Sequence, residues 1–179
     1  MKNLGELLAL QPDHADAHNN LGIALAMKGK LDEAIPHFHD AIRSNPNYAS
    51  SHSNLGNALA VQHKLDEAIK HYREALRLKP DDAQAHNNLG NALAEQGKVD
   101  EALGNYREAL RLNADNPEAH CNLALALLRQ GKREEAAAHF AGADHPSPFM
   151  LETFLVRSPL ALPAITHVDY SARIQTVHQ

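Results

Sequence analysis

The chain repeats itself at an interval of 34 residues. A segment that reads HNNLGNALAEQGKVDEAL begins at His86, and similar segments begin at His18, His52 and His120. One such unit is too short to bury an apolar face by itself, so neighbouring units must stack to make a continuous core. The regular spacing therefore predicts a linear array of similar structural units.

Each unit has the pattern of two helices joined by a turn. In the first half, leucines four residues apart, such as Leu55 and Leu59, lie on one helical face. In the second half, alanine, an aromatic residue and alanine recur at fixed places, as in Ala68, Tyr72 and Ala75. Small residues allow close helix packing, and the aromatic ring fills the space between helix pairs. The turns carry, in chain order, Gly29, His63, Gly97 and Gly131. The sequence thus predicts an all-α, helix-turn-helix solenoid.

The order of these residues within each unit resembles the tetratricopeptide repeat, which places Leu-Gly, Ala, an aromatic residue, Ala and Pro over 34 residues. The resemblance implies a right-handed superhelix whose concave groove is lined by the first helix of each unit and binds a protein or an extended peptide. We expect four repeats at 15–48, 49–82, 83–116 and 117–146. Residues 1–14 resemble the end of a further second helix, and residues 147–179 form a tail without the repeat pattern.

Asparagine occupies the same place in the first helix of every repeat. Asparagine is a mediocre helix former, so a reason other than helix propensity is needed for its recurrence. Its side chain both donates and accepts, which suits hydrogen bonding to the peptide groups of an extended ligand. The spacing resembles the asparagine ladder in the tetratricopeptide region of O-linked N-acetylglucosamine transferases. The alternative is that these asparagines only bond to neighbouring repeats. The candidate peptide-binding residues are Asn20, Asn54, Asn88 and Asn122, with Asn57 and Asn91 one turn further along.

Other recurring polar residues have structural explanations. Asp-Glu pairs begin each of the first three second helices, where anionic side chains favour the positive end of the helix dipole. Histidines in equivalent places of successive repeats are expected about 8–10 Å apart, too far to share one metal ion, so we expect them to pack between repeats. Cys121 follows His120 directly, and adjacent helical residues do not face each other, so no nucleophilic dyad is expected. The sequence indicates no catalytic residue, cofactor or metal site.

A carboxylate clamp, as in tetratricopeptide domains that bind chaperone C-termini, is not expected either. Those domains resemble this fold, but they hold the carboxylate with lysine and arginine on successive first helices. Here the corresponding surface is expected to carry only amide side chains. These are Asn19, Asn54, Gln84 and Asn88.

Composition limits the partners and the compartment. The formal net charge is −5, so the chain as a whole offers no basic surface for nucleic acid or an anionic membrane. No apolar stretch is long enough for a membrane span. The single cysteine excludes an internal disulfide and fits a reducing compartment. We therefore expect a cytoplasmic protein.

The tail resembles the C-terminal region of the carbamoyltransferases that modify nodulation factors and certain antibiotics. The resemblance lies in SPFML and, after a gap, LPAITHVDYSARIQTV. It implies that His167, Asp169 and Arg173 match the family pattern, whereas Tyr170 stands where glycine is typical. The metal-bearing domain of that family is not recognisable, so we expect a scaffold without catalysis. Two alternatives remain: a substrate-recruiting section of a larger glycosyltransferase or carbamoyltransferase, and an adaptor that self-associates through its N-terminal repeat edge.

Overall fold

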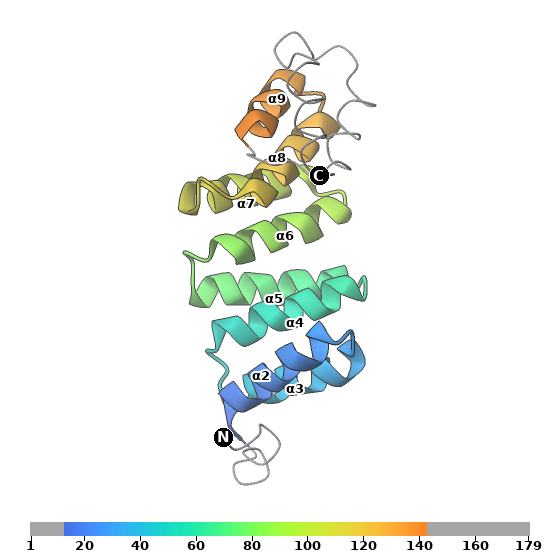
Figure 1. Cartoon of the computed structure of the whole chain (residues 1–179), viewed down its shortest axis with the longest axis vertical. Helices are drawn as coiled ribbons and strands as arrows, with labels where there is room; N and C mark the ends of the chain where they lie inside the picture. Colours follow the sequence, from blue (N-terminus) through green and yellow to red (C-terminus); the bar gives the residue numbers. More distant parts are fainter. Residues whose placement is uncertain (1–12, 143–179) are drawn as a thin grey trace, which may run out of the picture.

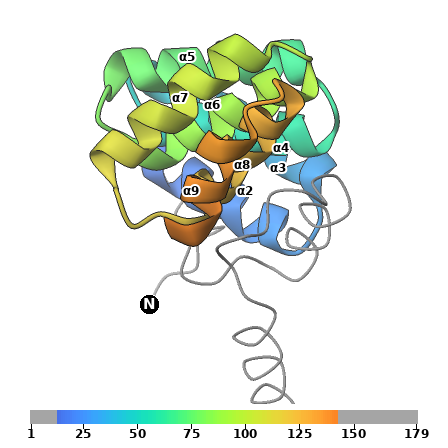
Figure 2. The same cartoon turned by 90° about the horizontal axis from the view of Figure 1, so that it is seen from above.

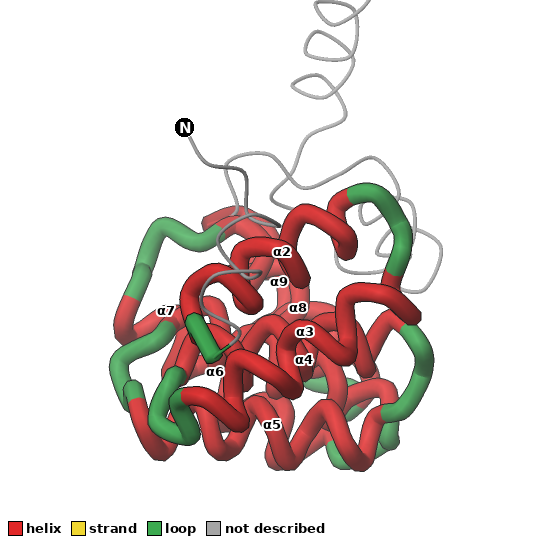
Figure 3. Tube along the Cα trace, turned by 90° about the horizontal axis from the view of Figure 1, so that it is seen from below, coloured by secondary structure: helices red, strands yellow, loops and turns green. Residues whose placement is uncertain are grey.

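The computed structural model describes residues 13–142. Within that range every regular element is an α-helix, which confirms the predicted all-α fold (Figure 3). The first helices of the four repeats are α2 (Ala15–Met27), α4 (Ala49–Val61), α6 (Ala83–Glu95) and α8 (Pro117–Arg129). The second helices are α3 (Leu31–Ser44), α5 (Leu65–Leu78), α7 (Val99–Leu112) and α9 (Arg133–Gly142). The predictions for residues 1–12 and for the tail at 147–179 lie outside the described residues.

Local sequence signals explain where the helices begin. The side chain of Asp82 accepts a hydrogen bond from the backbone N–H of Ala85 at 3.0 Å, and Asn116 does the same for Ala119 at 3.1 Å. Both side chains satisfy a backbone donor that the first turn leaves without a helical partner. The second helices lack such a side-chain cap but carry acidic residues in their first turn, which face the positive end of the helix dipole.

The turn inside each repeat needs a left-handed residue. Gly29, Gly97 and Gly131 have φ angles of 75°, 79° and 77°, and His63 adopts 57° at the same place. A residue with a Cβ atom is disfavoured in this region, which explains why three of the four turns use glycine. His63 keeps the same turn, and its ring bonds to Glu95 of the next repeat, with Nδ1 and Oε1 2.9 Å apart.

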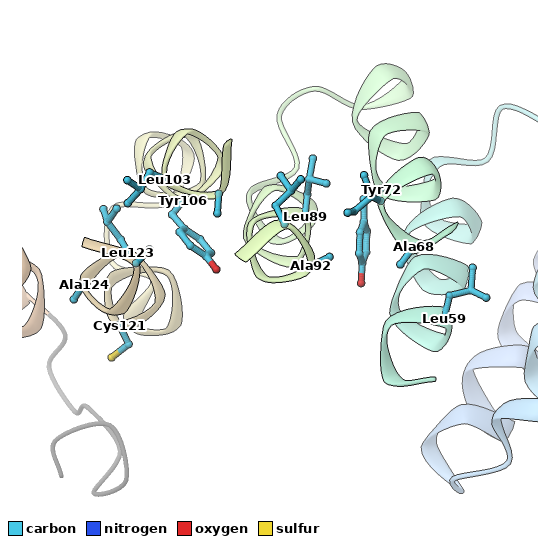
Figure 4. Close-up of a cluster of buried hydrophobic side chains, with 14 of the residues drawn as sticks. Leu59, Ala68, Tyr72, Leu89, Ala92, Leu103, Tyr106, Cys121, Leu123 and Ala124 are labelled. Carbon is cyan, nitrogen blue, oxygen red and sulfur yellow. The ribbon is translucent and has the colours of Figure 1, made fainter. Parts of the chain in front are cut away.

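The core runs along the whole stack rather than gathering at a centre (Figure 4). In the first three repeats the second helix presents a buried aromatic ring flanked by two buried alanines, as predicted, and in the fourth Phe140 and Ala136 are buried. Across repeats, leucines of the first helices fill the remaining space. The fully buried large side chains include Phe38, Leu55, Leu93, Leu123 and Leu127.

The helix pairs stack in chain order along one long axis (Figure 1). Successive pairs are turned relative to one another, as the view along the stack shows (Figure 2). Consecutive first helices contact each other, from α2 to α4, α6 and α8, whereas no two second helices in the described part of the chain make comparable contact. The first helices therefore lie on the inner side of the curved stack.

Candidate peptide-binding groove

The asparagine at the equivalent place in each first helix lies on the inner side of the stack. Asn20 is exposed, and Asn54, Asn88 and Asn122 are half-buried. Asn20 makes no side-chain hydrogen bond within residues 13–142. The other three donate across the repeat boundary: Asn54 Nδ2 to Asn19 Oδ1 at 3.0 Å, Asn88 Nδ2 to Asn57 Oδ1 at 2.8 Å, and Asn122 Nδ2 to Asn87 Oδ1 at 3.1 Å. We call Asn20, Asn54, Asn88 and Asn122 the asparagine column. Its last three members link each repeat to the one before it.

These links use only part of the hydrogen-bonding capacity of each amide. An asparagine amide has two N–H donors and an oxygen that can accept two bonds. Asn54 and Asn122 each give one donor to the preceding repeat, and their oxygens accept no bond from any described residue. The Asn88 oxygen accepts one bond, from Gln84 Nε2 at 2.9 Å. A donor and an acceptor therefore remain on each half-buried amide.

Asn57 and Asn91 have a structural role that the sequence analysis missed. Each accepts a hydrogen bond from the tyrosine hydroxyl of its own repeat: Tyr72 to Asn57 at 2.8 Å and Tyr106 to Asn91 at 2.8 Å. Burial raises the pKa of both tyrosines, so the hydroxyls stay protonated and donate. In the first repeat the same two places hold Ile23 and Phe38, and in the fourth they hold Leu125 and Phe140. This pairing of Tyr with Asn and of Phe with an aliphatic residue was the available sequence signal.

Asn19 does not lie on the surface where the sequence analysis placed it. Its side chain is buried, with 3% of the residue exposed. Its Oδ1 accepts bonds from Ser51 Oγ at 3.1 Å and from Asn54 Nδ2. The sequence interpretation was wrong because residues 19 and 20 both follow the histidine, and only the packing of α4 against α2 decides which of them is covered.

A histidine in each first helix bonds to the second helix of its own repeat. The Nδ1 atoms of His52 and His71 lie 3.2 Å apart, and the ring of His52 also places Nε2 3.1 Å from the carbonyl oxygen of Pro46. Since a carbonyl oxygen only accepts, Nε2 of His52 carries the proton, and Nδ1 accepts from His71. His18 with His37, and His120 with His139, form the same pair, whereas His86 bonds to Asn105. The sequence analysis missed these partners, which come from the second helix.

These pairs predict that acid weakens the array. Burial, followed by the neighbouring histidine, lowers the pKa of His71 and of His139. Such rings are harder to protonate in the folded chain than in the unfolded chain, so their stabilising contribution is present above the ordinary histidine pKa of about 6.5 and is lost as the pH falls below it. We expect a lower urea midpoint at pH 5.5 than at pH 7.5.

The His71→Asn variant provides the control for this pH dependence. It copies the His86–Asn105 pair of the third repeat, so it should fold and show a smaller loss between the two pH values. A midpoint that is unchanged or higher at pH 5.5 in the parent chain would contradict the prediction. Far-ultraviolet circular dichroism during urea titration measures the midpoint.

The aspartates at the start of the second helices also link the repeats. Asp32 Oδ1 accepts from Gln62 Nε2 at 2.8 Å, and Asp66 Oδ1 accepts from Gln96 Nε2 at 2.8 Å. Asp100 and Gln130 form the equivalent bond. The helix dipole alone therefore does not account for these aspartates, because each also binds the glutamine that follows the first helix of the next repeat.

A pocket of about 280 Å³ opens on the inner side between α6 and α8. Its apolar wall is formed by Leu125, Ala126 and Ala94. Its polar groups come from Asn91, Asn122, Glu95, Arg129 and Tyr106. Arg129 Nη1 donates to the carbonyl oxygen of Ala94 at 3.2 Å, which holds its guanidinium beside the pocket. The pocket therefore combines amide groups with one anionic and one cationic side chain.

The residue that ends the first helix differs in character between the repeats. Met27 ends α2 and Val61 ends α4, and they are the large hydrophobic residues most exposed in the described chain, at 84% and 66%. Glu95 and Arg129 occupy the same place in α6 and α8. The C-terminal ends of the first helices are thus apolar in the first two repeats and charged in the last two.

Cys121 is not a reactive group of this face. It is buried, with 2% of the residue exposed, and burial raises the pKa of its thiol. A thiol held in its neutral form is a poor nucleophile and a poor metal ligand.

None of the helices within residues 13–142 combines the length with the apolar character that crossing a bilayer requires.

Models of known families match most of the chain. The tetratricopeptide repeat model matches residues 15–48, and a second model, described as TPR repeat, matches residues 56–97 and 90–131. The model of the carbamoyltransferase C-terminus matches residues 126–179, a range that begins inside α8 and includes α9. A search of the curated proteins found no match.

Solved structures share the fold at low sequence identity. The structure of PilF from Pseudomonas aeruginosa aligns with a TM-score of 0.83 and 22% identity, over 97% of this chain and 81% of that chain. A crystal structure of MamA aligns with a TM-score of 0.74 and 22% identity, over 84% and 85% of the two chains. MamA from Desulfovibrio magneticus gives 0.73 and 22%, over 78% and 79%. These similarities agree with the helical solenoid. The matched repeats show that the chain belongs to the tetratricopeptide repeat family.

Proposed function

We propose that the chain is a protein-interaction scaffold that binds an extended peptide segment along the inner face of its first helices. The observation that carries this proposal is the unused hydrogen-bonding capacity of Asn54 and Asn122. Among residues 13–142, each amide keeps one N–H and its oxygen after bonding to the preceding repeat. This is the donor-acceptor pair that matches one peptide group of a ligand backbone.

Side chains beside the asparagine column supply the preference for particular sequences. Met27 and Val61 offer exposed apolar surface at one end, and Glu95 and Arg129 offer opposite charges at the other. A matching segment carries apolar side chains toward α2 and α4 and charged side chains toward α6 and α8. Four first helices spaced about 10 Å apart span roughly 30 Å, which an extended peptide of about ten residues covers.

Asn20 offers the cleanest test of this groove. Its side chain is exposed and has no hydrogen bond within the described residues, so Asn20→Ala removes a ligand contact without breaking an internal link. A displayed library of random peptides of about ten residues is selected on the full chain, and the selected peptides are measured by fluorescence anisotropy. We expect Asn20→Ala combined with Asn122→Ala to weaken their binding at least tenfold.

The matched control for the asparagine column is Asn47→Ala, which changes an exposed asparagine in the turn between α3 and α4. It should leave the affinity unchanged. Circular dichroism checks that the double variant is folded, since Asn122 also bonds to buried Asn87. Equal affinity of the parent and a folded double variant would remove the asparagine column from the recognition surface.

A second candidate function follows from the carbamoyltransferase match at residues 126–179. In this case the array recruits a substrate for a longer transferase, and the described repeats themselves supply no catalysis. Sequencing the DNA on both sides of the coding region distinguishes the two functions, because an uninterrupted reading frame into a glycosyltransferase or carbamoyltransferase domain would favour the second. Absence of such a frame would favour a separate scaffold.

The compartment and the oligomeric state remain predictions. We propose a cytoplasmic location, which the single, buried Cys121 is compatible with. Self-association through the N-terminal repeat edge involves residues outside the described range. Sedimentation velocity at increasing concentration tests it, and a constant sedimentation coefficient would contradict it.

A further inference from the structure

Three potential metal ligands converge in the first repeat. His18 comes from α2, and His37 and Asp40 come from α3, where their spacing of three residues places them on one face. The Nδ1 atoms of the two histidines lie 3.1 Å apart, and Asp40 Oδ2 lies 3.9 Å from His18 Nδ1. Nitrogen and oxygen atoms of all three lie within 4.8 Å of one another. His18 is buried, and the other two residues are half-buried.

The spacing of the two nitrogens fits a shared metal ion. A tetrahedral zinc ion holds imidazole nitrogens at about 2.0–2.1 Å, which places two such nitrogens about 3.3 Å from each other. The observed separation of the Nδ1 atoms is close to that value. A bound ion would take the place of the hydrogen bond between the two Nδ1 atoms.

The other repeats supply internal comparisons, because each lacks one part of this arrangement. The third repeat has Asn105 instead of the second histidine, and the fourth has Gly142 at the place of the carboxylate. The second repeat has both histidines and Glu74, but Arg77 binds both oxygens of that carboxylate, with its Nε atom 3.1 and 3.0 Å from them. Only the first repeat joins two histidines to a carboxylate oxygen that faces them, among the described residues.

The carboxylate of Asp40 is held in an orientation that leaves one oxygen for a metal ion. Arg43 Nη2 pairs with Oδ1 at 2.8 Å, whereas Oδ2 is the oxygen closer to His18. Arg43 is largely exposed, so its charge is screened by solvent. His37 and Asp40 are only half-buried, so solvent would supply the water that completes the coordination.

We propose that His18, His37 and Asp40 bind a divalent transition-metal ion, with Zn²⁺ the first candidate, and that the ion clamps α2 to α3 at the N-terminal end of the array. Two imidazoles and one carboxylate are a donor set typical of zinc, completed here by water. The ion would fix the first helix pair, which has a repeat neighbour on only one described side. This inference does not depend on the proposed peptide groove.

The test titrates the full chain with zinc chloride in an isothermal calorimeter. His37→Asn copies the native His86–Asn105 pair, so it should keep the helix contact while removing a ligand. Asp40→Asn removes the carboxylate independently. Because changes to residues behind metal ligands already cost about 10–100-fold in affinity, we expect loss of a direct ligand to weaken binding by more than tenfold in each variant.

His71→Asn is the matched control, since it makes the same change at the equivalent place of the second repeat. It should bind zinc like the parent chain. Histidine labelled with ¹⁵N gives an independent readout: zinc should shift the Nδ1 resonances of two rings in the parent and of neither in His37→Asn. Equal zinc affinity in the parent, His37→Asn and Asp40→Asn, or an equal loss in His71→Asn, would overturn the proposal.

Discussion

Replacing Tyr106 with alanine should lower the free energy of unfolding by about 3–5 kcal/mol, the range for removing a large buried aromatic ring. The ring is 2% exposed and lies between α6, α7 and α8, as Figure 4 shows. Its removal leaves a cavity at the junction of two repeats and an unpaired oxygen on Asn91. Urea denaturation followed by circular dichroism measures the change.

The matched control separates the ring from its hydroxyl group. Tyr106→Phe keeps the ring and removes only the bond to Asn91, so it should cost about 1 kcal/mol. Adding Asn91→Leu reproduces the native Leu125–Phe140 pair of the fourth repeat and should recover most of that loss, because replacing both partners by apolar groups is close to neutral. A Tyr106→Ala loss no larger than that of Tyr106→Phe would contradict the packing role of the ring.

Gly90→Ala should destabilise the chain by about 1–3 kcal/mol, although alanine is the better helix former. A Cβ atom at residue 90 would lie 2.5 Å from Cε1 and 2.7 Å from Cδ1 of Tyr106. The ring is buried and its hydroxyl is bonded to Asn91, so it cannot move aside without losing packing or that bond. The same denaturation assay measures the effect.

Gly104→Ala is the control for this substitution. Gly104 also lies inside a helix, α7, but no atom would lie within 4 Å of its added Cβ. There the gain in helix propensity acts alone, and stability should rise by about 0.5–1 kcal/mol. If Gly90→Ala also raised stability, close approach of the ring would not explain the glycine.

The helices and the solenoid could be predicted from the sequence because both depend on periodicity. The spacing of leucines four apart predicts a helical face, and the 34-residue interval predicts the stacking of units. Glycine at three of the four turns predicted where the helices of a repeat are joined, and the structure adds that these positions are left-handed. Only His63 breaks that rule while keeping the conformation.

Contacts between different helices could be predicted less well, because they depend on how the helices cross. His52 and His71 are 19 residues apart, and nothing in the 34-residue period says that their rings meet. Likewise, the pattern placed Asn57 on the inner face but did not show that it accepts from Tyr72. The Tyr–Asn and Phe–aliphatic pairing within the four repeats carried that information, and comparing places within a repeat would have found it.

The bonds between repeats have a consequence for the length of the molecule. Each glutamine binds the aspartate 30 residues before it, and each donating asparagine of the column binds an asparagine of the unit just before it. Since every such bond joins immediate neighbours, an inserted copy of the second or third repeat meets matching donors and acceptors at both of its junctions. Gain or loss of one of these two repeats as a complete unit therefore preserves the bonds between repeats, whereas a change of a few residues inside a unit misaligns them.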